Sequence, residues 1–246
     1  MTRKGLNLWR SEERIKMVKN HLKRLNMPKS WQIGRKLKKW VMRPNPGAHS
    51  LNDGLSLNTL IKEVLVLAST SRESRNILLN KEVFVDGKIR TEKKLIVGFM
   101  DIVSIPKISK HFRILFNSKG KLMAVPVDEK ESKIKLSKIK NKSLVNGKFQ
   151  LNLSDGRNIL VDKNDYSVGD SLLLELPSQK VLSVVKLEKG CLICLTGGKH
   201  TNDFGKVEDL SADKVTYTSK SGKTFQTSSK YAFAVGKDKS LISLSE

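Results

Sequence analysis

The chain is short of cysteine, of acidic residues and of long apolar runs, and each shortage excludes a class of protein. Its two cysteines, Cys191 and Cys194, are too few for a disulfide framework and indicate a reducing compartment. No apolar run approaches the ~20 residues that span a bilayer. No apolar segment follows Arg3 and Lys4, as a secretory signal peptide would require. We therefore expect a protein of the cytoplasm with no membrane partner.

Motifs for catalysis and for metal binding are missing as well. The four histidines stand in unrelated contexts, and no nucleophile elbow or dinucleotide-binding glycine pattern is visible. A structural zinc site needs four ligands, but Cys191 and Cys194 have only His200 nearby, so we interpret them as small buried hydrophobes. The segment Gly197–Lys199 lacks the spacing of a phosphate-binding loop. We expect no enzyme, no metal, no cofactor and no small-molecule substrate.

What the chain has in excess is positive charge. It carries 47 Lys and Arg against 24 acidic residues, a formal net charge of +23, and fourteen of those basic residues lie in the first fifty positions beside only two acids. Like charges at this density repel one another unless an anionic polymer neutralises them. A long polyphosphate is the usual partner, so the pattern predicts nucleic-acid binding by a basic N-terminal arm over residues 1–50.

Within this arm, residues 11–25 have the spacing of an amphipathic helix, and the prolines and glycines of residues 26–50 predict an extended segment that becomes ordered on RNA. Trp31 and Trp40 are interleaved with basic residues. Tryptophan stacks on RNA bases beside Lys and Arg, although packing against a neighbouring domain is the alternative role. The predicted RNA contacts of the arm are Lys23, Arg24, Lys29, Trp31, Arg35, Lys36, Lys38, Lys39 and Arg43.

Residues 51–110 predict a small module of two helices and a hairpin. Apolar residues over 57–65 repeat with helical spacing, and Thr70–Glu73 is a capping box that begins a second helix. That helix should end near Asn80 in a left-handed conformation. The segment 83–89 predicts a hairpin with a type I′ turn at its Asp-Gly pair, and 101–105 predicts a further strand.

Basic residues of this module offer a second surface for phosphate. Arg72 and Arg75 share one face at the start of the second predicted helix, where free backbone N–H groups also favour anions. Lys88 and Arg90 extend this surface past the hairpin. A solvated basic face without a partner is the alternative.

Beyond residue 110 the short apolar runs and frequent glycines predict strands. We expect a central β domain over 111–180, with the charged segment 128–143 as a short helix or loop, and five strands over 181–246 that form a small SH3-like barrel. In this barrel Gly190–His200, followed by Phe204–Val207, resembles a KOW motif, in which a glycine turn presents Lys199, His200 and Lys206 to phosphate. The predicted fold class is mixed α+β with several small domains.

The order of these parts resembles a known family. The helix–helix–hairpin unit alone is similar to the S4-type RNA-binding fold, and the whole chain resembles the S4e family of archaeal and eukaryotic small-subunit ribosomal proteins. The matching strings are Asn20–Leu25, Pro28–Trp31, Arg43–His49, Gly98–Pro106, Gln150–Asn158 and Thr196–His200. The resemblance implies a structural protein on the ribosome, in contact with small-subunit rRNA and neighbouring ribosomal proteins.

Other classes of function remain open at this point. A KOW barrel beside a basic module also fits a transcription elongation factor, which would purify with RNA polymerase instead of ribosomes. An RNA-modifying enzyme could carry the helix–helix–hairpin module, but we find no catalytic domain beside it. The stretch 11–25 could instead lie on anionic lipid, although its apolar stripe has no aromatic residue.

Overall fold

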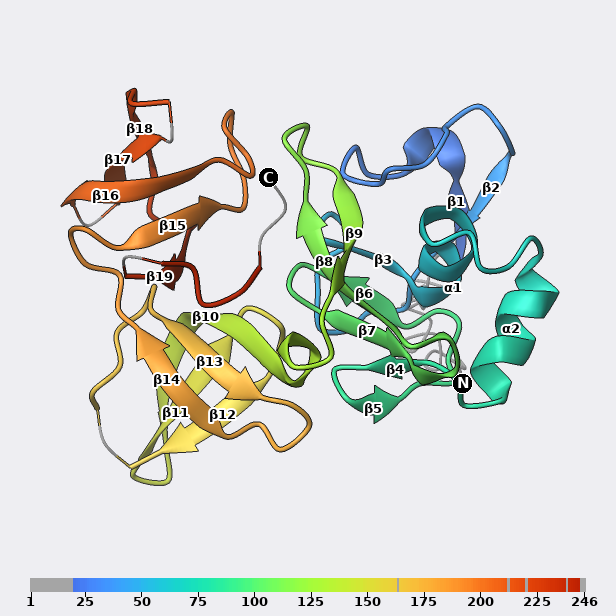
Figure 1. The fold of residues 1–246 in the computed structure, drawn as a ribbon, viewed down its shortest axis with the longest axis horizontal. Coiled ribbons are helices and arrows are strands. Elements are labelled where there is room, and N and C mark those ends of the chain that lie inside the picture. Colours follow the sequence, from blue (N-terminus) through green and yellow to red (C-terminus); the bar gives the residue numbers. More distant parts are fainter. Residues whose placement is uncertain (1–19, 163, 212, 220, 238, 244–246) are drawn as a thin grey trace, which may run out of the picture.

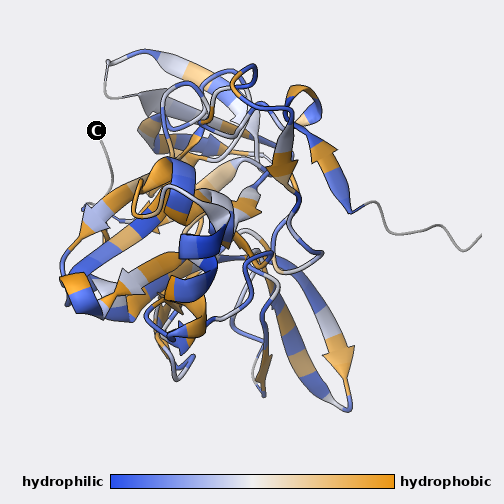
Figure 2. Cartoon of the chain, turned by 90° about the vertical axis from the view of Figure 1, so that its right-hand side faces the viewer, coloured by the Kyte–Doolittle hydropathy of each residue, from blue (hydrophilic) through white to orange (hydrophobic). Residues whose placement is uncertain are grey.

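A computed structural model describes residues 20–162, 164–211, 213–219, 221–237 and 239–243. Over these residues the chain is mostly β, with three five-stranded sheets, two two-stranded ribbons and short helices (Figure 1). Apolar and polar residues alternate along many strands, so each sheet has a buried face and a solvated face (Figure 2). No helix in the described residues is long and apolar enough to cross a membrane.

The first sheet and the helices beside it follow the sequence prediction in several local details. Helix α2 begins with the predicted capping box of Thr70 and Glu73. The hairpin turn has positive φ at Asp86 (50°) and Gly87 (73°), as a type I′ turn requires. The left-handed residue after α2 is Lys81 (φ 60°), and not Asn80 as expected. The elements are β3 (Gly54–Ser56), α1 (Leu57–Thr59), η2 (Leu60–Val64), α2 (Ser71–Leu79), β4 (Phe84–Val85), β5 (Lys88–Ile89), β6 (Ile96–Gly98) and β7 (Ile102–Ile105).

The first sheet continues past residue 110, where we expected a domain boundary. Its order is β5-β4-β7-β8-β9, with β8 (Lys110–Phe116) antiparallel to β7 and β9 (Leu122–Val127) antiparallel to β8. The 3-10 turn η3 (Pro106–Ile108) and the left-handed Ser109 (φ 50°) reverse the chain between β7 and β8. The proline therefore makes a hairpin turn and does not begin a linker.

Residues 20–50 pack against the first sheet, which differs from the extended arm that we expected. Strand β1 (His21–Lys23) pairs with β2 (Trp40–Met42), and the 3-10 turn η1 (Arg24–Asn26) follows β1. Leu22, Met27 and Trp31 are buried in the same core as residues of α1 and α2. The predicted helix over 11–25 lies mostly outside the described residues, and its last residues form β1 and η1 instead.

The second sheet contains an unexpected element. Its order is β12-β11-β10-β13-β14, and its central strand β10 (Ile134–Val145) occupies most of the charged segment that we predicted to be a helix or loop. Leu136 and Ile139 of β10 are buried in apolar clusters, and the charged Lys135 directly before Leu136 is fully buried as well. The other strands are β11 (Lys148–Leu153), β12 (Asn158–Val161), β13 (Ser171–Glu175) and β14 (Val181–Val185), and the 3-10 turn η4 (Glu131–Lys133) precedes β10.

The third sheet has the five strands that were predicted for the end of the chain. They lie in the order β18-β17-β16-β15-β19 around a core that includes Val215 and Tyr217. Cys191 and Cys194 are buried in different apolar clusters, and burial raises the pKa of both thiols, that of Cys194 to about 12. The strands are β15 (Leu192–Leu195), β16 (Phe204–Leu210), β17 (Lys214–Ser219), β18 (Thr224–Ser228) and β19 (Ala232–Gly236).

The three sheets share an apolar core. Met100 from the turn before β7, Leu115 from the first sheet, Leu136 from the second, and Cys194 and Phe233 from the third form one buried cluster. The third sheet lies above the second in Figure 1, and the first lies to their right. The apolar contact among all three sheets fixes how they are placed relative to one another.

A buried charge cluster also joins the first and second sheets. Lys135 Nζ lies 2.8 Å from Asp86 Oδ2, 2.6 Å from Asp101 Oδ1 and 3.0 Å from Asp155 Oδ2. Arg157 Nη2 lies 2.6 Å from Asp86 Oδ2. These five residues form the charge cluster, in which the two carboxylates of the first sheet meet the lysine of β10.

Candidate nucleic-acid interface

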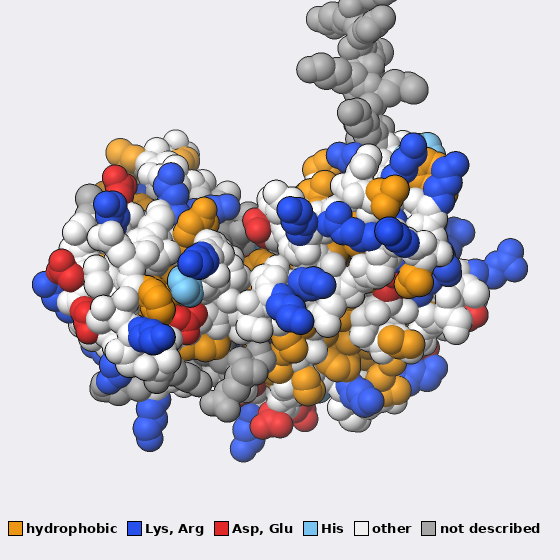
Figure 3. Space-filling view, turned by 90° about the horizontal axis from the view of Figure 1, so that it is seen from above, with side chains coloured by type: hydrophobic (Ala, Val, Ile, Leu, Met, Phe, Trp, Pro, Cys, Tyr) orange, Lys and Arg blue, Asp and Glu red, His pale blue; other side chains and the backbone are white. Residues whose placement is uncertain are grey.

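Three basic segments that are far apart in the sequence lie along one face of the molecule. The backbone N–H of Leu122 donates to the carbonyl of Ser30 at 2.7 Å, so the turn between β8 and β9 lies beside residues 28–31. A Cβ placed on Gly120 of that turn would be 3.8 Å from Thr201, so the loop after β15 is also close. All three segments lie at the top of Figure 1 (Figures 1 and 3).

We call this surface the upper face. Lys and Arg side chains gather on it over the N-terminal segment and in the middle of the view, and acidic side chains are sparse there (Figure 3). Its solvent-accessible basic and aromatic residues are Lys29, Lys36, Lys38, Lys39, Trp40, Lys119, Lys121, Lys199 and His200.

Two of the predicted RNA contacts, Arg24 and Trp31, are 2% exposed and point into the protein. Trp31 Nε1 donates to the carbonyl of Gly54 at 2.9 Å, so this tryptophan takes the packing role. Arg24 pairs with Glu63 and donates to the carbonyl of Gly34. Because carboxylate and carbonyl partners hold these two side chains inside the fold, we leave both residues out of the interface.

These inward-pointing residues hold the basic loop in place. The half-buried Arg35, another predicted contact, donates from Nη2 to the carbonyl of Met27 at 3.0 Å and so closes the turn. Lys29, Lys36, Lys38 and Lys39 remain exposed on the same loop, and Lys23 is exposed on β1. The folded segment therefore presents its lysines at fixed positions before any partner binds.

Trp40 is the tryptophan that remains available on the surface. It is 48% exposed, Lys39 Nζ lies 5.4 Å from the centre of its ring, and the ring of His21 lies 5.5 Å away. An exposed indole beside a lysine can stack on an RNA base. The signal that favours Trp40 in the sequence is its place directly after the densest basic run, Lys36–Lys39.

Lys119 and Lys121 of the β8–β9 turn are contributions to the upper face that the sequence did not predict. The side-chain oxygen of Asn117 accepts from the backbone N–H groups of both lysines at 2.9 Å, and Gly120 has φ +67°. This arrangement makes a tight turn. The turn lies beside residues 28–31 because Leu122 forms a β-bridge with Trp31. Sequence periodicity does not reveal a contact between residues so far apart.

The loop after β15 is also tightly built. A Cβ on Gly197 would lie 2.7 Å from the ring of Tyr231, so only glycine fits there. The hydroxyl of Thr201 donates to the carbonyl of Gly198 at 2.9 Å. Lys199 is exposed at the tip, and the ring of His200 lies 4.3 Å from that of Phe225. The predicted pair Lys199 and His200 thus joins the upper face.

The remaining predicted contacts lie elsewhere. Arg72 and Arg75 are exposed on α2, and Lys88 and Arg90 are exposed on and just after β5, on parts of the first sheet away from the upper face (Figure 1). Lys206 is exposed on β16. Arg43 is half-buried and lines a small cavity after β2.

Comparison with known proteins places the chain in a family. A family model described as "Ribosomal family S4e" matches residues 108–181, and one described as "RS4NT (NUC023) domain" matches residues 16–52. The chain is 43% identical over 235 residues to small ribosomal subunit protein eS4 of Methanosphaera stadtmanae, covering 92% of this chain and 96% of that protein. The chain belongs to the eS4 family.

Other eS4 proteins agree with this assignment. The eS4 protein of Methanocaldococcus jannaschii is 39% identical over 240 residues, with 92% of this chain and 98% of that protein covered. The crystal structure of 30S ribosomal protein S4e from Thermoplasma acidophilum matches with a TM-score of 0.67 at 30% identity, covering 75% of this chain and 96% of that one. The family resemblance predicted from the sequence is confirmed.

Proposed function

We propose that this chain is a structural constituent of the small ribosomal subunit and that it binds small-subunit rRNA through the upper face. Membership of the eS4 family supports this, since the relatives carry the name of a small-subunit ribosomal protein. The observation that carries the RNA contact is the convergence of three basic segments on one face. Its place of action is the ribosome in the cytoplasm, and neighbouring small-subunit proteins are its other partners.

Binding works mainly by phosphate neutralisation. Each exposed lysine that meets a phosphate releases condensed counterions, so the logarithm of the binding constant falls by ~0.9 per phosphate for each tenfold rise in salt on duplex RNA. Because residues 20–43 are already folded, their ordering does not oppose binding as it would for a disordered arm. Trp40 adds stacking, which does not depend on salt.

A second RNA surface lies on the first sheet. Arg72 and Arg75 are exposed on the first turns of α2, and Lys88 and Arg90 extend it. Glu73 accepts hydrogen bonds from the backbone N–H groups of Ser69 and Thr70 just before α2. The arginine side chains therefore make the phosphate contacts at the start of this helix. In this proposal residues 51–127 form an S4-type RNA-binding module, and the third sheet is the SH3-like barrel of a KOW domain to which Lys206 belongs.

The alternative functions have less support. The named relatives are ribosomal proteins, which favours the ribosome over a transcription complex or an RNA-modifying enzyme. We infer a non-enzymatic role on the same ground.

Sucrose-gradient sedimentation of native lysate at low and high salt tests the proposal. We expect the protein to travel with the small subunit and to stay bound through a moderate salt wash. Replacement of Lys36, Lys38 and Lys39 by Gln should release it at lower salt than the wild type. A protein that stays at the top of the gradient at every salt concentration would refute the ribosomal assignment.

A further inference from the structure

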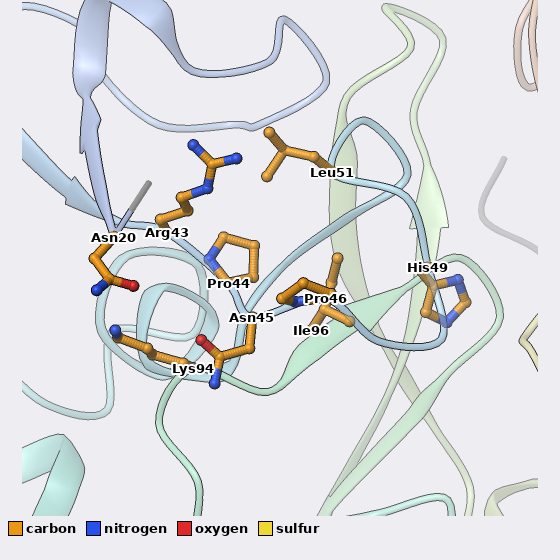
Figure 4. Close-up of a pocket in the computed structure, with 9 residues that line it drawn as sticks. All are labelled: Asn20, Arg43, Pro44, Asn45, Pro46, His49, Leu51, Lys94 and Ile96. Carbon is orange, nitrogen blue, oxygen red and sulfur yellow. The ribbon is translucent and has the colours of Figure 1, made fainter. Parts of the chain in front are cut away.

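A small cavity of about 140 Å³ lies between the loop after β2 and strand β6, on the N-terminal segment (Figure 4). We call it the notch. Figure 4 shows residues of the loop and the side chain of Ile96 facing one another, with Arg43 above Pro44 and the Lys94 amino group toward Asn20. The residues that line it are Asn20, Arg43, Pro44, Asn45, Pro46, His49, Leu51, Lys94 and Ile96.

The walls of the notch are held in place by contacts within the fold. The backbone N–H of Asn45 donates to the carbonyl of Lys94 at 2.9 Å, and the Asn45 side chain donates to Glu92. A Cβ on Gly47 would lie 2.8 Å from Ile96 Cγ2, so the loop lies directly on β6. Two prolines further restrict the loop backbone. The notch is therefore formed before a ligand enters.

The chemistry of the notch combines apolar walls with cations. Pro44, Pro46, Leu51 and Ile96 supply flat apolar surface, and none of the lining residues is acidic. Arg43 forms no ion pair or side-chain hydrogen bond with any other described residue, and the same holds for the amino group of Lys94. The carboxylates nearest the notch are bound to Asn45 and His49, so Glu92 and Asp101 do not pair with Arg43 or Lys94. A half-buried arginine and lysine that form no ion pair favour an anion beside an apolar group.

A nucleotide has this combination of groups. Its base has two apolar faces, and its phosphate accepts hydrogen bonds from Arg and Lys. We propose that the notch takes one unstacked nucleotide of the bound RNA. The base lies against the apolar walls of the notch, and the phosphate lies between Arg43 and Lys94. This inference rests on the proposed function, and it adds recognition of a single splayed-out base to non-specific phosphate binding.

The test is binding of the full-length protein to purified small-subunit rRNA in the presence of competitor tRNA over a range of salt. Leu51→Trp fills the notch and leaves every charge in place. We expect it to weaken binding roughly 5- to 150-fold, the range for loss of one stacked base, with an unchanged salt slope. Arg43→Ala should instead lower the salt slope by about one.

Leu182→Trp is the matched control, because Leu182 is 54% exposed on β14, outside the notch. It should bind as the wild type does. Equal affinity of Leu51→Trp, Leu182→Trp and the wild type, at equal thermal stability, would overturn the nucleotide site and leave RNA binding intact. A wild type that does not bind rRNA at all would overturn the proposed function itself.

A second measurement does not depend on the folding of a variant. Small subunits that contain 4-thiouridine are irradiated, and crosslinked peptides of this protein are identified by mass spectrometry. We expect a nucleotide adduct on residues 43–51 or on the peptide that contains Ile96. Nucleotide adducts found only on other segments of the protein would refute the proposal.

Discussion

Replacement of Lys135 by Met tests whether the charge cluster holds the first and second sheets together. Lys135 is fully buried and contacts three carboxylates, of Asp86, Asp101 and Asp155. Methionine keeps most of the volume of the side chain and removes its charge. Arg157 would then be the only permanent cation left beside these carboxylates in the described residues. His49 Nε2 lies 2.8 Å from Asp101 Oδ2, the oxygen that Lys135 does not contact.

The expected loss of stability is large. Removal of one partner from a buried ion pair destabilises a protein by about 3–5 kcal/mol, because the other charge is left without compensation. For a chain of this size each kcal/mol lowers the melting temperature by about 2–4 °C, so Lys135→Met should melt about 6–20 °C lower at pH 7. Lys133→Met is the control, because Lys133 is 65% exposed and pairs only with the exposed Glu129.

The loss should also depend on pH. In the wild type burial opposes ionisation, but the charge of Lys135 holds the pKa of Asp101 and Asp155 below their ordinary value of 3.8. Both groups therefore stabilise the fold above pH 3.8, and this stabilisation is lost as the pH falls through their folded pKa values. Burial and the charge of Asp101 raise the pKa of Asp86, which works in the opposite direction.

Without Lys135 the same carboxylates are buried without their main cation, so their pKa values should rise above 3.8. Their ionised forms would then destabilise the fold, and protonation at lower pH would remove this destabilisation. We therefore expect the difference in melting temperature between wild type and Lys135→Met to shrink from pH 7 to pH 4.5, as measured by circular dichroism. A difference that stays constant over this range, or that equals the effect of Lys133→Met, would refute the role of the cluster.

Three further predictions address the surface and the core. Replacement of Lys29, Lys36, Lys38 and Lys39 by Gln should reduce the salt slope of rRNA binding by up to about 3.6. The same change at four other exposed lysines, Lys110, Lys140, Lys180 and Lys214, should reduce it less, and equal slopes would argue against the upper face. Because Trp40 is exposed, Trp40→Ala should weaken rRNA binding by about 1–3 kcal/mol without lowering the melting temperature. Because Trp31 is buried, Trp31→Ala should lower the free energy of unfolding by about 3–5 kcal/mol. The reverse pattern would contradict the assigned roles. Cys194, whose pKa burial raises to about 12, should not react with iodoacetamide at pH 8 until the protein is unfolded, and mass spectrometry of the native protein checks this.

Local signals in the sequence predicted local structure well. The capping box at Thr70 and Glu73 and the Asp86-Gly87 turn depend on residues only a few positions apart, so the sequence alone is sufficient. The short apolar runs beyond residue 110 also became strands. In each of these cases the residues that determine the conformation lie within the element itself.

The failures of sequence reasoning have a common cause in long-range contacts. Strand β10 was not predicted because Lys135 interrupts its apolar pattern, and only the distant Asp86, Asp101 and Asp155 make that burial favourable. Residues 26–50 looked like an extended arm because prolines and glycines interrupt them and basic residues dominate. Trp31 is nevertheless covered because Gly54, distant in sequence, accepts its N–H.

The same reason explains which parts of the candidate site were predicted. Basic residues can be read from the sequence, but whether a given one faces solvent depends on its partners. Arg24 has Glu63, which lies on η2, and so it turns inward. Lys119 and Lys121 join the surface only because the β8–β9 turn lies beside residues 28–31.

The apolar core that Leu22, Met27 and Trp31 share with Leu78 of α2 sets the distance between the N-terminal lysines of the upper face and the arginines of α2. These two basic surfaces point in different directions on one body (Figure 1). An RNA segment on each would be held at a spacing that the protein dictates, and binding of the first would raise the effective concentration of the second. The protein would then hold two parts of the rRNA at a fixed distance from each other. Its stiffness would matter as much as its charge, so a substitution that loosens this core would weaken RNA binding although it changes no contact residue.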